Sequence, residues 1–215
     1  MNHVRSNVLI NPDRFFSELS EREVNLTIPA LVVLIWAITD AIYVVIVGAL
    51  LIRNFPDEAI SSGIVIAVLV IQAIVMSVVF GFIWAVLFYT ISIHFKGNGS
   101  FKRCFEFTGY GFIPVIVAPI IALAVTMVVL HTVELPVESP ELMLEALVLQ
   151  LMQNSLMKTI PVITCLLGLW SVYIWMYGIK HARKISTRNA LITVGVPVGI
   201  AFVCYVNYIY SIIII

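Results

Sequence analysis

Long apolar stretches separated by short polar segments dominate the chain, and within each stretch the apolar residues are continuous rather than alternating. A helix that crosses about 30 Å of hydrocarbon needs about 20 mostly apolar residues. Five stretches meet this length: Leu26–Ile52, Ile64–Ile93, Gly111–Val133, Thr159–Ile179 and Ala190–Ile214. Continuous runs favour helices over barrel strands, because backbone groups in lipid must bond within their own segment. The pattern predicts an all-α, polytopic integral membrane bundle of five transmembrane helices.

A short amphipathic helix is predicted before the first apolar stretch. The segment Asn11–Asp13 is typical of a helix start, because Asn caps free amides, Pro tolerates the first position and Asp complements the positive helix end. Phe15 and Phe16 then give an apolar stripe on a charged body. This helix lies on the membrane face, packs under the bundle, or does both. The chain thus divides into an N-terminal segment, 1–25, and a five-span domain, 26–215.

The composition fits the membrane environment and few others. Of the 215 residues 61% are hydrophobic and only 11% are charged, whereas a soluble domain usually carries about 25% charged residues. The 12 basic and 12 acidic residues cancel, so no excess positive charge points to nucleic acid. The lipid bilayer is therefore the expected partner, and a soluble enzyme or a nucleic-acid binder fits poorly.

The basic residues predict the orientation of the chain. Short cytoplasmic loops are enriched in Lys and Arg, and ten of the 12 basic residues lie before the first stretch, between the second and third, or between the fourth and fifth. The other connections carry only Arg53 and Lys158. We therefore expect a multi-pass protein of the cell membrane with a cytoplasmic N-terminus and an external C-terminus. The ten residues are Arg5, Arg14, Arg22, Lys96, Lys102, Arg103, Lys180, Arg183, Lys184 and Arg188.

Prolines and glycines interrupt the apolar stretches. Pro114 and Pro119 should each remove a helix hydrogen bond from the third span and bend it. Gly195 and Gly199 form a small-xxx-small pair that favours close helix packing, either within the chain or between protomers of a homo-oligomer. The Leu- and Met-rich segment 141–156 is too short for a crossing, so we expect it to stay outside.

Three polar residues form a candidate intramembrane site. Asp40 is the only carboxylate deep in a span, where an ionisable group costs roughly 2.5–3.5 kcal/mol on insertion scales. Gln72 lies at a comparable depth, so a neutral Asp40 bonded to Gln72 is one explanation. A second is a small channel or transporter built around Asp40, Gln72 and Asn207, since carriers gather polar groups at the midplane. A third is a contact of Asp40 between protomers of an oligomer.

No pattern in the sequence indicates catalysis or a bound cofactor. The chain contains no HExxH motif, phosphate-binding loop or nucleotide fingerprint. Its three cysteines and four histidines show no spacing typical of a zinc site. We therefore expect a non-enzymatic protein with no catalytic, cofactor-binding or metal-binding residues.

Short motifs in a fixed order resemble those of the Yip domain family, the Ypt/Rab-interacting five-span membrane proteins, and in particular its prokaryotic branch. Each motif is short, but together their order and spacing cover nearly the whole chain. They are Asn11-Pro12 with Phe15-Phe16, Gly97-x-Gly99-Ser100-Phe101, Gly109-Tyr110 with Pro114, Gly168-Leu169-Trp170, Gly178, and Ile185-Ser186 with Ala190.

The resemblance implies five spans and a role in organising membranes or recruiting partners rather than catalysis. It also implies a protein partner at the cytoplasmic face, with a small GTPase as the class suggested by eukaryotic members. We expect the working face to comprise a helix at Pro12–Arg22, a hairpin at Lys96–Arg103 and a loop at Lys180–Arg188. Its candidate interaction residues are Phe15, Phe16, Lys102, Arg103, Tyr110, Arg183 and Lys184.

Overall fold

The computed structural model describes residues 7–52, 59–132 and 149–214, and these ranges contain helices and no strand. The prediction of an all-α polytopic bundle is confirmed. The predicted outer segment 141–156 lies outside the described residues up to 148, and its described part is helical over 149–153. In chain order the elements are α1 (Pro12–Ser20), α2 (Thr27–Ile52), α3 (Ala59–His94), α4 (Phe101–Tyr110), the 3₁₀ turn η2 (Pro114–Ile116), α5 (Val117–Leu130), α7 (Thr159–Arg183) and α8 (Thr187–Ile214).

Two short helices begin at side-chain caps. The Asn11 side chain accepts a hydrogen bond from the amide of Arg14 at 3.2 Å, which confirms the predicted start of α1. Ser100 caps α4 in the same way, because its hydroxyl accepts from the amide of Arg103 at 3.2 Å. The predicted hairpin Lys96–Arg103 therefore ends in a helix, and its last basic residues lie in the first turn of α4.

Four helices, α2, α3, α7 and α8, are each long and apolar enough to cross a membrane. A fifth crossing results if α4 and the segment Pro114–Leu130, which meet at 45°, count as one bent span. Gly111, where the third span was predicted to begin, lies at the bend between these two segments, because α4 ends at Tyr110 and α5 begins only at Val117. Pro114 has no amide hydrogen to continue the helix. Pro119 lies in the first turn of α5, where a missing amide costs no helical bond.

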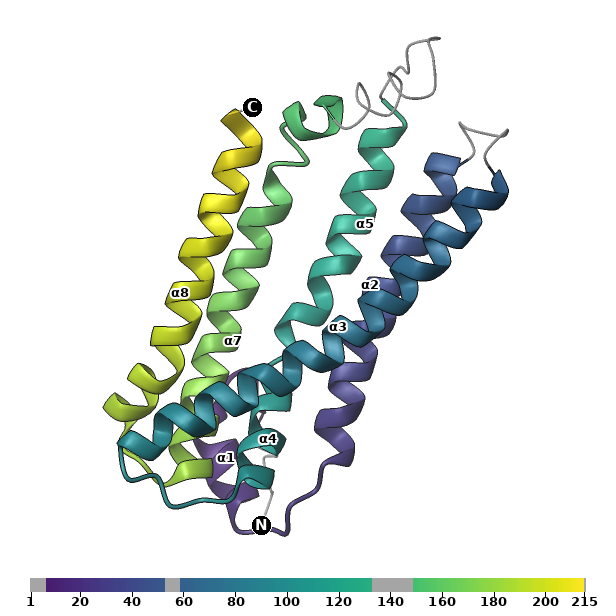
Figure 1. Ribbon diagram of the computed structural model, residues 1–215. Helices are drawn as coiled ribbons and strands as arrows, with labels where there is room; N and C mark the ends of the chain where they lie inside the picture. Colours follow the sequence, from purple (N-terminus) through teal and green to yellow (C-terminus); the bar gives the residue numbers. More distant parts are fainter. Residues whose placement is uncertain (1–6, 53–58, 133–148, 215) are drawn as a thin grey trace.

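The helices form a bundle whose two ends differ (Figure 1). Helices α2 and α3 pack along each other on one side, α7 and α8 on the other, and α5 runs between the two pairs. Helices α1 and α4 lie together at one end, where α3 ends and α8 begins. We call this the charged end, defined as α1, α4, residues 95–100 and residues 180–188.

The aromatic core lies in the half of the bundle next to the charged end. The indole of Trp84 on α3 stacks on that of Trp175 on α7, with ring centroids 5.6 Å apart. Phe112, in the turn after α4, packs edge-on against Trp175 at 5.1 Å and stacks on Trp36 of α2 at 5.3 Å. Gly111 allows this contact, since a Cβ there would lie 2.0 Å from the indole nitrogen of Trp175. Four segments are therefore joined through one cluster.

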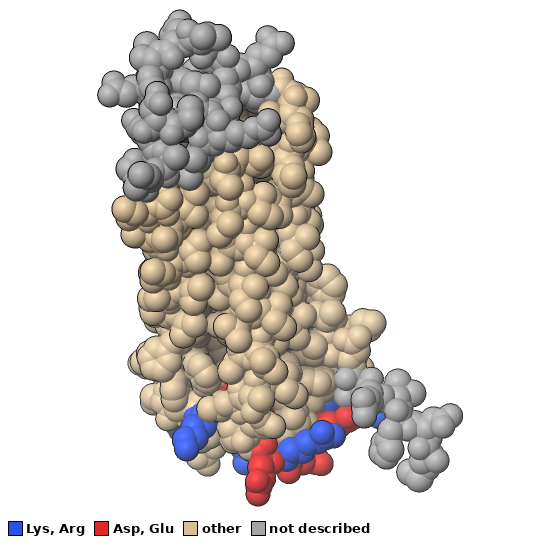
Figure 2. All heavy atoms as spheres, turned by 90° about the vertical axis from the view of Figure 1, so that its right-hand side faces the viewer, with Lys and Arg blue, Asp and Glu red and all other residues tan. Residues whose placement is uncertain are grey.

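The outer surface divides sharply between apolar and charged regions. In Figure 2 the face of the bundle that is turned toward the viewer is almost free of Lys, Arg, Asp and Glu, and the charged side chains gather at the charged end. Along α3, side chains such as Ile64 and Ile71 are more than half exposed. Exposed apolar side chains on this scale suit a surface that contacts lipid rather than water.

Candidate functional site

Helix α1 is fixed under the bundle by one carboxylate with two basic partners. Oδ1 of Asp13 accepts hydrogen bonds from Nζ of Lys180 and from Nε2 of His181, each at 2.6 Å. The bond from Lys180 is the main reason why the pKa of Asp13 lies below its usual value, and His181 acts in the same direction. The first turn of α1 is thereby joined to the last turns of α7.

The apolar side of α1 faces protein. Phe16 is fully buried, with its ring 4.7 Å from that of Phe107 and beside Gly178 of α7. Phe15 packs edge-on against Tyr110 at 5.3 Å. Helix α1 therefore packs under the bundle, which was one of the two predicted positions. Three of the predicted interaction residues contact each other there. Phe16 and Tyr110 are buried, and Phe15 is partly buried.

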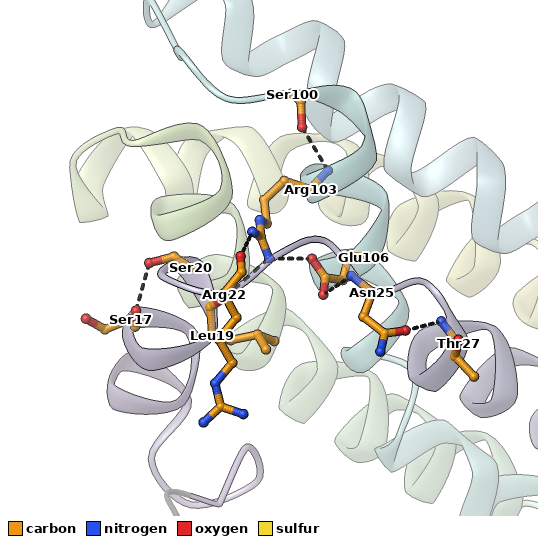
Figure 3. A network of polar contacts seen from close by, with 9 residues as sticks. All are labelled: Ser17, Leu19, Ser20, Arg22, Asn25, Thr27, Ser100, Arg103 and Glu106. Atoms are coloured by element: carbon orange, nitrogen blue, oxygen red, sulfur yellow. Dashed lines mark hydrogen bonds and ion pairs between the residues drawn. The ribbon is translucent and has the colours of Figure 1, made fainter.

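A second polar network connects α4 to the segment between α1 and α2 (Figure 3). Nη1 of Arg103 lies 2.7 Å from Oε2 of Glu106, whose side chain is fully buried. The other oxygen of Glu106 accepts from the amide of Asn25 at 3.0 Å. The same guanidinium donates to the carbonyls of Leu19 and Arg22. Arg103 therefore organises the chain at this end, and only 14% of its side chain is exposed.

Arg183 is also a structural residue. Its side chain is buried, Nε donates to Oγ of Ser92 at 2.8 Å, and Nη2 donates to the carbonyl of Gly97 at 2.6 Å. The guanidinium lies 4.2 Å from the ring centre of Tyr89, close enough for a cation–π contact. The residues 95–100 thus close over α7, and a Cβ at Gly99 would lie 1.8 Å from the carbonyl oxygen of Ala182.

The accessible part of the predicted face is smaller than the sequence suggested. Of the seven candidates, only Lys102 and Lys184 are exposed. The predicted loop Lys180–Arg188 is also shorter, because α7 continues to Arg183 and α8 begins at Thr187. Among these seven candidates, the aromatic and Arg side chains pack and bond within the protein, whereas the two Lys side chains extend into solvent. Sequence reasoning gave less weight to two further exposed basic residues of this end, Lys96 and Arg188.

A polar groove of about 590 Å³ lies beside the Arg103–Glu106 network. Residues 22–28 form one wall, and Glu106 and Tyr110 form the other. Nothing in the sequence predicted it, because the groove depends on how the segment between α1 and α2 folds over α4. Within the described residues, no group of three or more His, Cys, Asp or Glu side chains could hold a metal ion.

The three intramembrane polar residues are not brought together. Gln72 and Asn207 are exposed side chains, and the Asn207 amide donates to the carbonyl of Val203 in its own helix at 2.8 Å. Asp40 is partly buried in α2. In the part of the chain that the structure describes, no hydrogen bond joins any two of the three. The proposed Asp40–Gln72 bond is therefore not present, and no polar cluster assembles at the midplane of one chain.

Gly195 and Gly199 on α8 have open space around them. A Cβ at either position would meet nothing within 4 Å. The pair therefore mediates no close helix packing within the described part of the chain. Contact between protomers of a homo-oligomer, the other predicted role of the pair, stays a prediction.

Comparisons with known proteins identify the family. The chain matches the family model described as the Yip1 domain over residues 6–207. It is 38% identical over 121 residues to an uncharacterized protein of the archaeon Methanocaldococcus jannaschii, and the match covers 54% of this chain and 84% of that relative. No solved structure matches the chain. Since the family model spans nearly the whole sequence and a relative occurs in an archaeon, the chain belongs to the Yip1 domain family of multi-pass membrane proteins, as its prokaryotic resemblance predicted.

Proposed function

We propose that the protein is a non-enzymatic membrane-organising or partner-recruiting module, and that its charged end faces the cytoplasm and is its interaction face. One observation carries the proposal: the face of the bundle seen in Figure 2 is almost free of charged side chains, whereas exposed basic and acidic side chains gather at one end. That end also carries most of the Lys and Arg residues of the chain, which is the distribution of cytoplasmic segments. Membership of the Yip1 domain family supports a role in membrane organisation.

The proposed face consists of four of the basic residues that are exposed at this end, Lys96, Lys102, Lys184 and Arg188. Exposed lysines near a membrane surface attract anionic head groups by roughly 1 kcal/mol each, and an acidic protein surface is attracted in the same way. The proposed partner is a protein that meets this face at the membrane, and a small GTPase is the class that the family resemblance suggests. Arg103 and Arg183 support the face from inside.

Crosslinking in native membranes tests the proposal. A photoreactive amino acid at exposed Ser186, in the turn between α7 and α8, captures neighbours of the face. We expect the combined charge reversal of Lys102, Lys184 and Arg188 to Glu to remove the captured partners. The matched control is Lys158→Glu, an exposed lysine at the opposite end of α7.

The buried arginines are left unchanged, because their substitution would damage the fold and lower capture without testing the face. Partners that survive the triple reversal in a protein of normal thermal stability would overturn the assignment of the face. Loss of the same partners in the Lys158→Glu variant would also overturn it, because the effect would then not be local.

A further inference from the structure

A second groove, apolar and separate from the polar one, lies between α2, α3 and α4. It encloses about 250 Å³ and is lined by residues of three helices together with Phe112. Its floor is buried, since Phe112 is 1% exposed, and its rims are open, since Leu34 is 46% and Val78 53% exposed. The groove therefore opens sideways, toward the surroundings of the bundle. The lining residues are Pro29, Ala30, Val33, Leu34, Val78, Gly81, Phe105, Gly109 and Phe112.

The size and the lining of this groove restrict its occupant. An apolar cavity of about 150 Å³ accepts benzene and stays dry, so this larger groove has room for an aliphatic chain. A helix with its side chains is about 10 Å across and does not fit. Because α2 and α3 are membrane-spanning helices and the groove opens between them, the aliphatic chain at hand is the acyl chain of a lipid.

A single basic residue lies where the head group of such a lipid would be. Lys102, Phe105 and Gly109 recur at i, i+3 and i+7 on α4, so they share one face of the helix. Phe105 and Gly109 line the groove, and Lys102 lies one turn before Phe105 on the same face of α4. The Lys102 side chain is exposed and makes no hydrogen bond or ion pair with the described residues.

The neighbouring carboxylate does not compete for Lys102. Glu106 follows Lys102 by one turn, but its side chain is buried and paired with Arg103. The positive charge of Lys102 is therefore available to a phosphate at the end of the apolar groove. We propose that this groove binds one acyl chain of an anionic membrane phospholipid and that Lys102 binds the phosphate of its head group.

Native mass spectrometry of the full chain in detergent tests this site. The probes are phosphatidylglycerol and phosphatidylcholine with matched acyl chains. We expect wild type to retain phosphatidylglycerol more strongly than phosphatidylcholine. Lys102→Gln should weaken the binding of phosphatidylglycerol by about fivefold and that of phosphatidylcholine much less, because the choline cation offsets the charge of the phosphate. The matched control is Arg188→Gln, an exposed basic residue on a different helix, which should change neither lipid.

The groove itself is tested by filling it. Ala30 is exposed on the rim of the groove. Ala30→Leu should weaken the binding of both lipids by roughly tenfold, because the acyl chain loses its buried contacts. Ala49→Leu, at an exposed alanine farther along α2, should have no effect. If Ala30→Leu fails to fold, Val78→Phe repeats the test from the opposite wall of the groove. Its control is Val68→Phe, at an exposed position of α3 outside the groove.

Two results would overturn the proposal. One is retention of both lipids at wild-type strength by folded groove-filling variants. The other is displacement of phosphatidylglycerol by glycerol phosphate at equal concentration, because a head group alone would then be sufficient. Neither result bears on partner capture at the charged end, which is a separate measurement.

Discussion

Arg103 neutralises the fully buried carboxylate of Glu106 across 2.7 Å, one turn along the same helix. The same guanidinium donates to the carbonyls of Leu19, in the last turn of α1, and of Arg22, in the segment between α1 and α2. A buried charge is tolerated only when it is paired and hydrogen-bonded. The pair therefore fixes how this segment folds over α4. Arg103, which the sequence analysis predicted to contact a partner, stabilises the fold instead.

Removing the Glu106 carboxylate should strongly destabilise the protein. Glu106→Ala leaves Arg103 largely buried without its counter-ion, and breaking a buried pair in this way costs about 3–5 kcal/mol. Thermal unfolding in detergent, followed by circular dichroism, measures the loss. The control is Glu18→Ala, which breaks the exposed ion pair with Arg14 and should cost about 0.2–1 kcal/mol. Equal losses in the two variants would contradict a structural role for the buried pair.

Substitution of Gly99 should be more harmful than its small size suggests. The added Cβ of Gly99→Ala would lie 1.8 Å from the carbonyl oxygen of Ala182, which is backbone and cannot rotate away. We expect a loss of about 3 kcal/mol or more, at or beyond the upper end of overpacking costs. Gly168→Ala is the control, since nothing lies within 4 Å of its added Cβ, and Ala is preferred in a helix by about 1 kcal/mol. Similar stability for the two variants would refute the close approach.

The sequence predicts the helices well and the site less well, for physical reasons. Apolar length alone located α2, α3, α7 and α8, because the bilayer fixes how many apolar residues a crossing needs. The third stretch differs most from its prediction, since the helix is broken over residues 111–113, next to the bend predicted at Pro114, and α4 precedes the break. Local chemistry at Asn11 located α1.

The interaction face could not be predicted in the same way, because burial at the charged end depends on contacts between distant segments. Arg183 and Lys184 are adjacent in the sequence, yet one is buried against Gly97 and the other is exposed. A Gly-rich turn beside basic residues looks like an exposed loop. Only the approach of Gly99 to Ala182 shows that these glycines allow segments to pack closely.

The attachment of α1 should depend on pH through Asp13. Its hydrogen bond with Lys180 lowers the pKa of this carboxyl in the folded state. The ionised carboxylate is therefore more favourable in the folded protein than in the unfolded chain. The resulting stability is fully present when the pH is above 3.8, the ordinary pKa of the carboxyl. It is lost as the pH falls through the lower pKa of Asp13 in the folded protein. Because 45% of the Asp13 side chain is exposed, we expect about 1 kcal/mol at most.

The comparison of wild type with Asp13→Asn measures this contribution. Wild type should unfold at a higher temperature at about pH 5, and the difference should shrink toward about pH 2 as Asp13 is protonated. Glu21→Gln, at an exposed position just after α1, is the control and should show a much smaller pH-dependent difference. A difference for Asp13→Asn that stays constant over this range would contradict ionic attachment of α1.

The proposed orientation makes opposite predictions for two exposed lysines at the two ends of α7. Lys184 follows α7 at the charged end, and Lys158 precedes it at the opposite end. A membrane-impermeant maleimide added to intact cells should label Lys158→Cys, whereas Lys184→Cys should require opened membranes, because basic turns stay in the cytoplasm. The unsubstituted chain, with Cys104, Cys165 and Cys204, provides the background. The reverse pattern would place the charged end outside, where no cytoplasmic partner reaches it, and the proposed face would fail with the orientation.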